Sequence, residues 1–328
     1  MSILVLNNAD VMELLPMNEC ISVMREALIS LAQGNVFQPL RTVITPPKAT
    51  GLLGLMPSFI SAERPALGLK VISVFPGNSA TGKDIHQGVV LLLSPDSGEP
   101  LAMMNASAIT AIRTAAVSAV ATDILARADA CELTIVGAGV QARTHLKAMS
   151  EVRSIKRCCV ATRDIQNAYR FAGEMQSEFP FPIEAIDSVE RSLAGSDLIV
   201  TATTASEPVI RREWISAGAH LNAVGASIPS ARELDTATVA AASLFVDRRE
   251  SAEKEAGDYL FALREEAITP GHIRAEIGEV LTGEKPGRTS ADEITIFKSL
   301  GLAVEDVAAA QYLYTKAVAT GRGSWLEF

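Results

Sequence analysis

The feature that most constrains the fold is the run LTIVGAGVQARTHL at residues 133–146. Its apolar start predicts a buried β-strand, and the residues after the glycines predict a helix. Gly137 permits a tight turn, Gly139 lets a ligand approach bare backbone, and the small Ala142 lets helix and strand pack closely. A pyrophosphate then binds the free N–H groups at the helix N-terminus. The predicted dinucleotide-binding loop comprises Gly137, Ala138, Gly139, Val140 and Gln141.

The segments after this loop alternate between strand-like and helical patterns. Apolar runs at 157–161, 198–202, 220–224 and 243–247 are separated by helical stretches such as 165–177. This βαβ rhythm is typical of a doubly wound parallel sheet, whereas a lone glycine motif also occurs in ordinary turns. We therefore predict an α/β protein with a Rossmann-type NAD(P)-binding domain over residues 126–303.

The end of the second predicted strand bears on the choice of nicotinamide cofactor. An acidic side chain about twenty residues after the glycines usually binds the ribose 2′-hydroxyl of NAD. Here Thr162 offers a hydroxyl and Arg163 a guanidinium, which suit a 2′-phosphate because a planar cation grips phosphate oxygens with two parallel hydrogen bonds. NADPH is favoured over NADH. The alternative leaves Arg163 solvated and makes Asp164 the ribose ligand.

Composition limits the remaining classes of function. A chain of 328 residues with 48% hydrophobic and 20% charged residues is typical of a two-domain globular enzyme. The net charge of −9 argues against nucleic-acid binding, which needs a basic stripe. The first residues carry no basic region before an apolar core, and no stretch approaches the ~18 apolar residues of a membrane span, so we expect a cytoplasmic protein without a membrane partner.

Cysteines and histidines suggest no metal site. The four histidines form no HExxH-type cluster, and the four cysteines lack metal-ligand or redox spacing. We expect buried thiols at Cys20, Cys131, Cys158 and Cys159.

Residues 1–125 have a different pattern of expected helices and strands, which predicts a second α/β domain. A helix is expected at 17–33, and β-prone segments at 38–44, 66–75 and 86–93 are bounded by Pro, Gly or Asn. Ser107 is the expected cap of a helix from Ala108 to about residue 126. The alanine-rich helix at 304–319 is expected to return to this domain, which then comprises 1–125 plus 304–328.

Three cations stand in apolar segments: Arg41, Lys70 and Arg113. Burying a cation without a partner is costly, so each must meet an anion, a carbonyl array or solvent. A small anionic substrate would satisfy all three. The alternative is an internal salt bridge or a side chain whose charged end reaches water.

The chain resembles the ornithine cyclodeaminase/mu-crystallin family over nearly its whole length. The matching segments are LGLK (67–70), HQ (86–87), TAIRTAAVS (110–118), GAGVQA (137–142), GAHLNAVGAS (218–227), RELD (232–235) and FKSLGLAVED (297–306). The resemblance implies a homodimer whose first domains pair, and a substrate pocket between that domain and the nicotinamide.

The resemblance also assigns roles. It implies that Arg41, Lys70 and Arg113 bind the substrate carboxylate, and that Lys70 donates a proton if burial lowers its pKa. It implies cofactor contacts from His86, Thr110, Thr203, Val224, Ala226 and Ser299, with His86 near the nicotinamide or substrate, or else a structural imidazole. Asn105 stands where relatives often have aspartate, and its effect is left open.

One departure from the family pattern distinguishes between reactions. Cyclodeaminases and the alanine dehydrogenase branch have an aspartate where this chain has Ser227. A serine hydroxyl is too weak a base to deprotonate a substrate ammonium, and we expect Asp235, eight residues further on, to be a helix cap and not a substitute for the missing acid. The Ala226-Ser227 form is similar to the mu-crystallin type, which implies NADPH-dependent reduction of pyrroline-2-carboxylate or piperideine-2-carboxylate to L-proline or L-pipecolate. The alternatives are an ornithine cyclodeaminase, an acyclic imino-acid reductase or alanine dehydrogenase, and a non-catalytic NADPH-dependent binder of small ligands.

Overall fold

The chain forms two compact units. The computed structural model describes residues 2–82 and 85–327. Met1–Arg113 with Gly301–Phe328 make up the first unit, and Thr114–Leu300 make up the second. The expected boundary at residue 125 coincides with the end of helix α3 (Ala106–Leu125), whereas the observed boundary along the chain falls inside that helix.

The second unit is built on an eight-stranded sheet in which every pairing is parallel. The strand order is β10-β9-β8-β11-β12-β15-β13-β14, so the direction of winding reverses between β8 and β11. Ligands of doubly wound sheets bind at such a reversal, outside the carboxyl ends of the strands. In the order of the sheet, the strands are Ile183–Ile186, Arg157–Ala161, Glu132–Val136, Leu198–Thr201, His220–Ala223, Thr295–Lys298, Ser243–Val246 and Ile273–Glu276.

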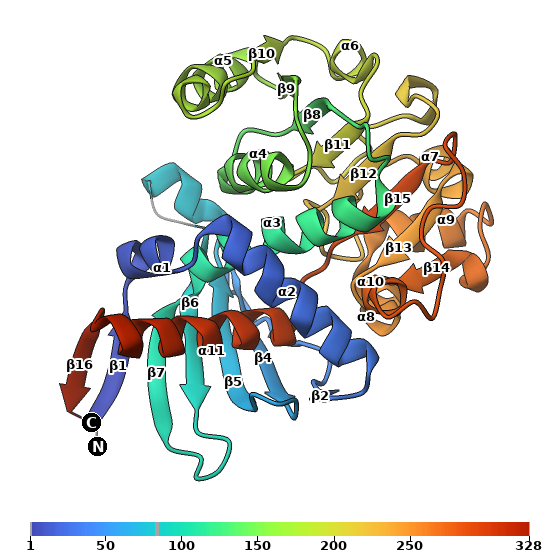
Figure 1. Ribbon diagram of the computed structural model, residues 1–328. Coiled ribbons are helices and arrows are strands. Elements are labelled where there is room, and N and C mark those ends of the chain that lie inside the picture. Colours follow the sequence, from blue (N-terminus) through green and yellow to red (C-terminus); the bar gives the residue numbers. More distant parts are fainter. Residues whose placement is uncertain (1, 83–84, 328) are drawn as a thin grey trace. The chain divides into compact units, whose positions relative to one another are not determined.

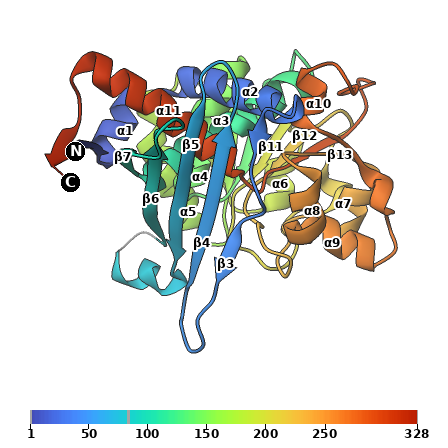
Figure 2. The same cartoon turned by 90° about the horizontal axis from the view of Figure 1, so that it is seen from below.

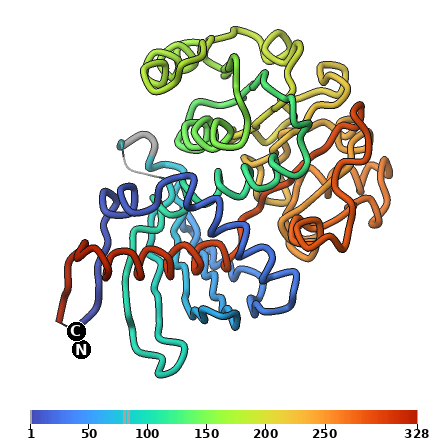
Figure 3. Tube along the Cα trace, viewed as in Figure 1, coloured from blue at the N-terminus to red at the C-terminus, as the bar shows by residue number. Residues whose placement is uncertain are grey.

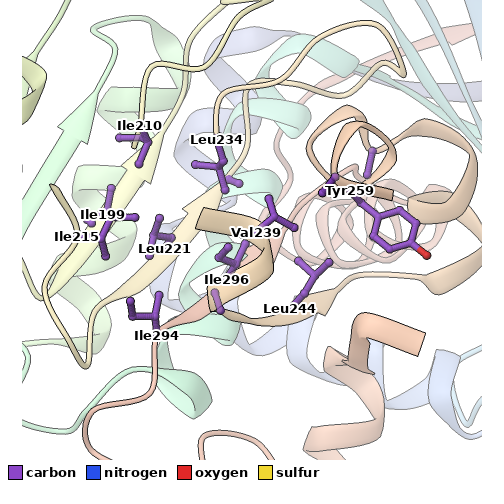
Figure 4. Close-up of a cluster of buried hydrophobic side chains, with 14 of the residues drawn as sticks. Ile199, Ile210, Ile215, Leu221, Leu234, Val239, Leu244, Tyr259, Ile294 and Ile296 are labelled. Atoms are coloured by element: carbon purple, nitrogen blue, oxygen red, sulfur yellow. The ribbon is translucent and has the colours of Figure 1, made fainter. Parts of the chain in front are cut away.

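Helices cover this sheet and bury its side chains. Strands β11, β12 and β15 are buried at every position, as expected for parallel strands with both faces covered. Figure 4 shows part of this core, where Ile199, Leu221 and Ile296 come from those three strands. The helices are α4 (Val140–Val152), α5 (Ile165–Met175), α6 (Val189–Leu193), α7 (Thr236–Ala241), α8 (Arg249–Glu255), α9 (Gly257–Arg264) and α10 (Ile277–Leu281), with short 3-10 turns at Gln176–Glu178, Arg212–Trp214 and Pro270–His272.

The first unit has a mainly antiparallel sheet in the order β16-β1-β7-β6-β5-β4-β2, with β3 also paired to β4. Only β1 and β7 run parallel among its described pairings, and β4, β5 and β6 lie side by side (Figure 2). Because β1 pairs with β16, the two chain ends are neighbours (Figure 3). The strands are β1 (Ser2–Leu6), β2 (Val36–Phe37), β3 (Thr42–Ile44), β4 (Leu52–Ile60), β5 (Ala66–Val74), β6 (His86–Leu93), β7 (Pro100–Asn105) and β16 (Ser324–Glu327).

Helices of the first unit lie over this sheet. Helix α11 (Ala303–Thr320) packs across β4, β5 and β6 and against α2 (Met17–Ala32), which confirms that the C-terminal helix returns to the first domain (Figure 1). A Cβ atom on Gly68 of β5 would lie 3.0 Å from Val307 of α11, so this glycine permits the close approach of helix and strand. The other elements are α1 (Asn8–Leu14) and the 3-10 turn Pro76–Thr81.

The start of α3 corrects one expectation. Its first turn is capped by Asn105, whose Oδ1 accepts a hydrogen bond of 2.9 Å from the Ala108 N–H. Ser107 is not the cap: its hydroxyl donates to the His86 carbonyl at 2.6 Å. The prediction was wrong because the helix begins at Ala106, one residue after the asparagine. The role of Asn105 is therefore a helix cap.

Helix α3 also corrects the statement about membrane spans. By length and composition alone, Ala106–Leu125 is a candidate span. Its apolar window is 83% buried inside the protein, as in a core helix.

Candidate functional site

The glycine loop after β8 lies at the winding reversal of the second unit. Gly137 has φ +122°, and a Cβ atom there would lie 2.4 Å from the Ala202 carbonyl oxygen after β11. Its N–H donates to the Ala161 carbonyl of β9 at 2.9 Å. Only glycine fits both constraints, so the loop is fixed between the ends of the two neighbouring strands.

Gly139 is the N-cap of α4 and leaves open space in front of the helix. Apart from its chain neighbours, no described atom lies within 4 Å of the position of a Cβ there. Val140 is 60% exposed, whereas Ala142 is fully buried against the sheet. The first N–H groups of a helix have no partner within the helix, so a helix start beside open space fits a pyrophosphate and these residues suit a dinucleotide.

Replacement by alanine is expected to lower stability at Gly137 and to weaken cofactor binding at Gly139. Gly137→Ala places a Cβ against a backbone carbonyl at a positive φ, so we expect a free energy of unfolding lower by about 1–3 kcal/mol. Gly139 has φ −81° and room for a methyl group, so Gly139→Ala should leave the unfolding temperature unchanged and weaken NADPH binding about tenfold or more. Thermal unfolding and NADPH titration check both, and equal losses of stability would contradict this division.

The residues after β9 define a candidate site for the adenosine ribose. The Thr162 hydroxyl donates to the Asp164 carbonyl at 2.5 Å, and the Asp164 carboxylate caps α5 through the Gln166 N–H at 3.0 Å. Arg163 is exposed and forms no hydrogen bond or ion pair with any residue that the structure describes. With the aspartate engaged as a cap, the arginine is the group available for a phosphate.

The other expected cofactor residues of the second unit gather at the same edge of the sheet. Thr203 follows β11, Val224 and Ala226 follow β12, and Ser299 follows β15. Ser227 is half-buried in the loop after β12. Because parallel strands end at one edge, the structure brings these residues together with the glycine loop.

The sequence did not identify Glu233, which joins the loops after β11 and β12 at this edge of the sheet. Glu233 is fully buried and accepts hydrogen bonds from both Thr203 and Ala226. It is part of the matched RELD segment, but only its contacts distinguish it from a surface acid.

A second candidate site is a buried cluster of four charged side chains in the first unit. Burial alternates along β5, which places Lys70 on the face covered by α11. Its Nζ atom lies 3.1 and 3.2 Å from the Asp306 oxygens. Arg113 donates from Nε to Asp306 at 3.1 Å and from Nη1 to Glu305 at 2.6 Å. The side chains of Lys70 and Arg113 are only 3% and 5% exposed, and both carboxylates are fully buried.

In this cluster two carboxylates of the chain itself compensate Lys70 and Arg113, which is the internal ion pairing that the sequence left open as an alternative to a substrate anion. The formal charges of the four groups cancel. Burial lowers the pKa of Lys70 from 10.5 to about 8, and the neighbouring Asp306 carboxylate limits the fall. A buried lysine with a pKa near neutrality is suited to give up a proton.

Glu305 and Asp306 were missed as site residues. They were part of the matched FKSLGLAVED segment, and the available signal was two adjacent acids at the start of an apolar helix. Gly301 also contributes: a Cβ atom there would lie 2.7 Å from Arg113 Nη1, so glycine lets the backbone approach the guanidinium.

The remaining expected residues of the first unit lie on separate elements. Arg41 is half-buried and precedes β3, so it is not on a strand as expected. His86 is the exposed first residue of β6, and Thr110 lies on α3 three positions before Arg113.

These features define a two-unit dinucleotide-binding enzyme. One unit has a Rossmann-type sheet with an open glycine loop, and the other buries a lysine and an arginine against two carboxylates. Comparison with family models identifies the family. The chain belongs to the ornithine cyclodeaminase/mu-crystallin family, whose model matches residues 1–321.

Known relatives match almost the full chain. Ketimine reductase mu-crystallin of Mus musculus is 43% identical over 86% of this chain and 85% of its own length. A Delta(1)-pyrroline-2-carboxylate reductase of Bacillus cereus is 39% identical over 99% of this chain and 100% of its own. The structure of Thermococcus litoralis Delta(1)-pyrroline-2-carboxylate reductase in complex with NADH and L-proline is 41% identical, with a TM-score of 0.95 over 98% of this chain and 99% of that one.

Proposed function

We propose that this chain reduces a small cyclic ketimine carboxylate, pyrroline-2-carboxylate or piperideine-2-carboxylate, to L-proline or L-pipecolate with NADPH. The observation that carries the proposal is the likeness, over nearly the whole chain, to the Thermococcus litoralis reductase solved with NADH and L-proline. Ser227 supports the reductive direction because a neutral hydroxyl cannot act as the base that removes a proton from a diamine substrate.

The residues of the first unit supply binding and a proton. Arg41 would bind the substrate carboxylate, since a guanidinium pairs with a carboxylate through two hydrogen bonds. Arg113 already donates from Nε to Asp306 and from Nη1 to Glu305, so its bond to the substrate carboxylate would come from another of its N–H groups. Lys70 would donate its proton to the imine nitrogen, and Asp306 orients the lysine and stabilises its charged form. Bound NADPH would supply the hydride that the imine carbon accepts, so that one hydride and one proton saturate the C=N bond.

Residues of the second unit would hold the cofactor. The N–H groups at the start of α4 would bind the pyrophosphate, and Arg163 would bind the 2′-phosphate. The Thr162 hydroxyl donates to the Asp164 carbonyl in this structure, so it would donate to the phosphate only in exchange for that bond. Thr203, Val224, Ala226 and Ser299 would contact the nicotinamide half.

The test of the function is a steady-state comparison of both cyclic ketimines with NADPH and with NADH, alongside ornithine. We expect NADPH oxidation with at least one ketimine and no ammonia from ornithine. Ammonia release without net NADH production would establish a cyclodeaminase, and ammonium-dependent turnover of a keto acid would establish an acyclic reductase. NADPH binding without turnover of any substrate would leave a ligand-binding role, and each of these outcomes overturns the proposal.

Arg163→Ala is expected to reverse the preference between cofactors. Because the exposed guanidinium would bind only the 2′-phosphate, its loss should weaken NADPH binding about 10- to 100-fold and leave NADH binding unchanged. Dissociation constants measured for both cofactors check this. Equal weakening of the two would exclude Arg163 as the phosphate ligand.

We also propose that the chain forms a homodimer through its first unit. The family resemblance supports this, and so do apolar side chains on β2 and β3, where Phe37, Val43 and Ile44 are 74%, 51% and 43% exposed. Replacing Phe37 and Val43 by serine should yield monomers in sedimentation velocity. A wild-type chain that sediments as a monomer at micromolar concentration would contradict the proposal.

A further inference from the structure

The buried carboxylate of Glu233 joins two loops at the carboxyl edge of the second-unit sheet. Its Oε1 atom accepts from the N–H and hydroxyl of Thr203 at 2.8 and 2.7 Å. Its Oε2 atom accepts from the Thr201 hydroxyl at 2.8 Å and from the N–H groups of Gly225 and Ala226 at 2.7 and 3.3 Å. One side chain thus fixes both the end of β11 and the loop after β12.

The two loops are packed closely around this carboxylate. A Cβ atom on Gly225 would lie 2.2 Å from the Thr203 carbonyl oxygen and 2.4 Å from Glu233 Oε1. The glycine therefore lets the β12 loop approach the β11 loop and the carboxylate. The same loops carry three of the residues expected to contact the cofactor, Thr203, Val224 and Ala226.

The backbone of Glu233 is itself held in place by Asp258. Asp258 Oδ1 accepts from the N–H groups of Glu233 and Leu234 at 2.8 and 2.9 Å. The Lys298 Nζ atom lies 2.9 Å from Asp258 Oδ2, and both side chains are almost completely buried. Lys298 immediately precedes Ser299, so the anchor extends to the end of β15.

The groups around Glu233 suit an ionised carboxylate. Three of the five hydrogen bonds come from backbone N–H groups, which can only donate, and the two threonine hydroxyls supply the others, so an ionised carboxylate accepts all five. Burial raises the pKa of Glu233, whereas the Lys298 charge and the Thr203 hydrogen bonds oppose that rise. An amide of the same shape would point its NH₂ group at a backbone N–H.

We propose that Glu233 is a positioning residue that holds the Thr203 and Gly225–Ala226 loops in the conformation that receives the nicotinamide half of NAD(P)H. The inference rests on the proposed function for the identity of the dinucleotide and for the assignment of these loops to its nicotinamide half. It predicts that loss of the carboxylate affects binding of the nicotinamide half and not of the adenosine half, which the proposed function assigns to the loop after β9.

The experiment compares NADPH with its adenosine fragment, adenosine 2′,5′-bisphosphate, by titration calorimetry without substrate. Glu233→Gln should weaken NADPH binding about tenfold or more and leave fragment binding within about twofold, because the fragment lacks the nicotinamide half. Thr201→Val removes a single donor and should give a smaller loss in the same direction, and it replaces Glu233→Gln if that variant does not fold. Glu265→Gln is the matched control, since Glu265 forms a half-exposed ion pair with Arg232 next to Glu233.

Two results would overturn the inference. Unchanged NADPH affinity in Glu233→Gln would show that the carboxylate is not needed to hold the two loops. An equal loss of affinity for NADPH and for the fragment would show a general structural role. Both measurements omit the ketimine, so a failure of the proposed reaction leaves them interpretable.

Discussion

Lys70→Met is expected to lower kcat about 10²- to 10⁴-fold and to leave the dissociation constant of NADPH within about twofold. Methionine fills the buried site of a side chain that is 2% exposed, but it carries no proton to donate. Asp306 retains a cationic partner in the variant, because Arg113 Nε lies 3.1 Å from it. Steady-state rates measured well below the unfolding temperature, together with an NADPH titration, check the prediction.

The pH profile of the wild-type enzyme provides the second readout of the same role. With a pKa of about 8, Lys70 is protonated below pH 8, so the rate of reduction should be level there and fall about tenfold per pH unit above it. Lys70→Arg keeps the charge but holds its proton at every accessible pH, so it should be as inactive as Lys70→Met. A Lys70→Arg variant with the wild-type rate and profile would exclude Lys70 as the donor.

Lys147→Met is the matched control for these variants. Lys147 lies on α4 and pairs with Glu178 at 2.6 Å, and the two side chains are 44% and 45% exposed. An ion pair in solvent contributes little to stability, and Lys147 belongs to neither candidate site, so the variant should match the wild type.

How far the fold could be predicted depended on how clear the apolar pattern of each strand is. The runs at β9, β11, β12 and β13 of the parallel sheet and at β5 and β6 of the first unit were found with ends shifted by a residue or less, whereas β10, β14 and β15 were not predicted as strands. Strand β4 of the first unit was missed because Gly54 and Pro57 interrupt its pattern, although it pairs with β5 along nine positions, from Leu52 to Ile60.

How far the site could be predicted depended on distance along the chain. The glycine loop is a local motif whose turn, cap and helix are contiguous, so its residues and its position could be read directly. Lys70 and Asp306 are 236 positions apart, and Arg113 and Glu305 are 192 apart. An unpaired cation in an apolar run predicts that some anion exists, but only the packing of α11 on β5 identifies which one.

Asp306→Asn is expected to lower the free energy of unfolding by about 3–5 kcal/mol. The substitution keeps the shape but leaves two buried cations, Lys70 and Arg113, with Glu305 as the one remaining carboxylate of the cluster. Loss of the nearby negative charge also removes the attraction that limits the fall in the pKa of Lys70. The fall in rate should therefore begin at a lower pH than in the wild type.

The double variant Lys70→Met with Asp306→Asn separates charge balance from the loss of individual contacts. Each single variant leaves the cluster with one unmatched charge, whereas the double variant removes one cation and one anion and retains the Arg113–Glu305 pair at 2.6 Å. Its stability loss should therefore be smaller than the sum of the single losses by about 1–3 kcal/mol, whereas kcat should stay as low as in Lys70→Met. Chemical denaturation of the four proteins measures this coupling. Strictly additive losses would mean that the lysine and the aspartate do not interact, and the proposed control of the Lys70 proton by Asp306 would be wrong.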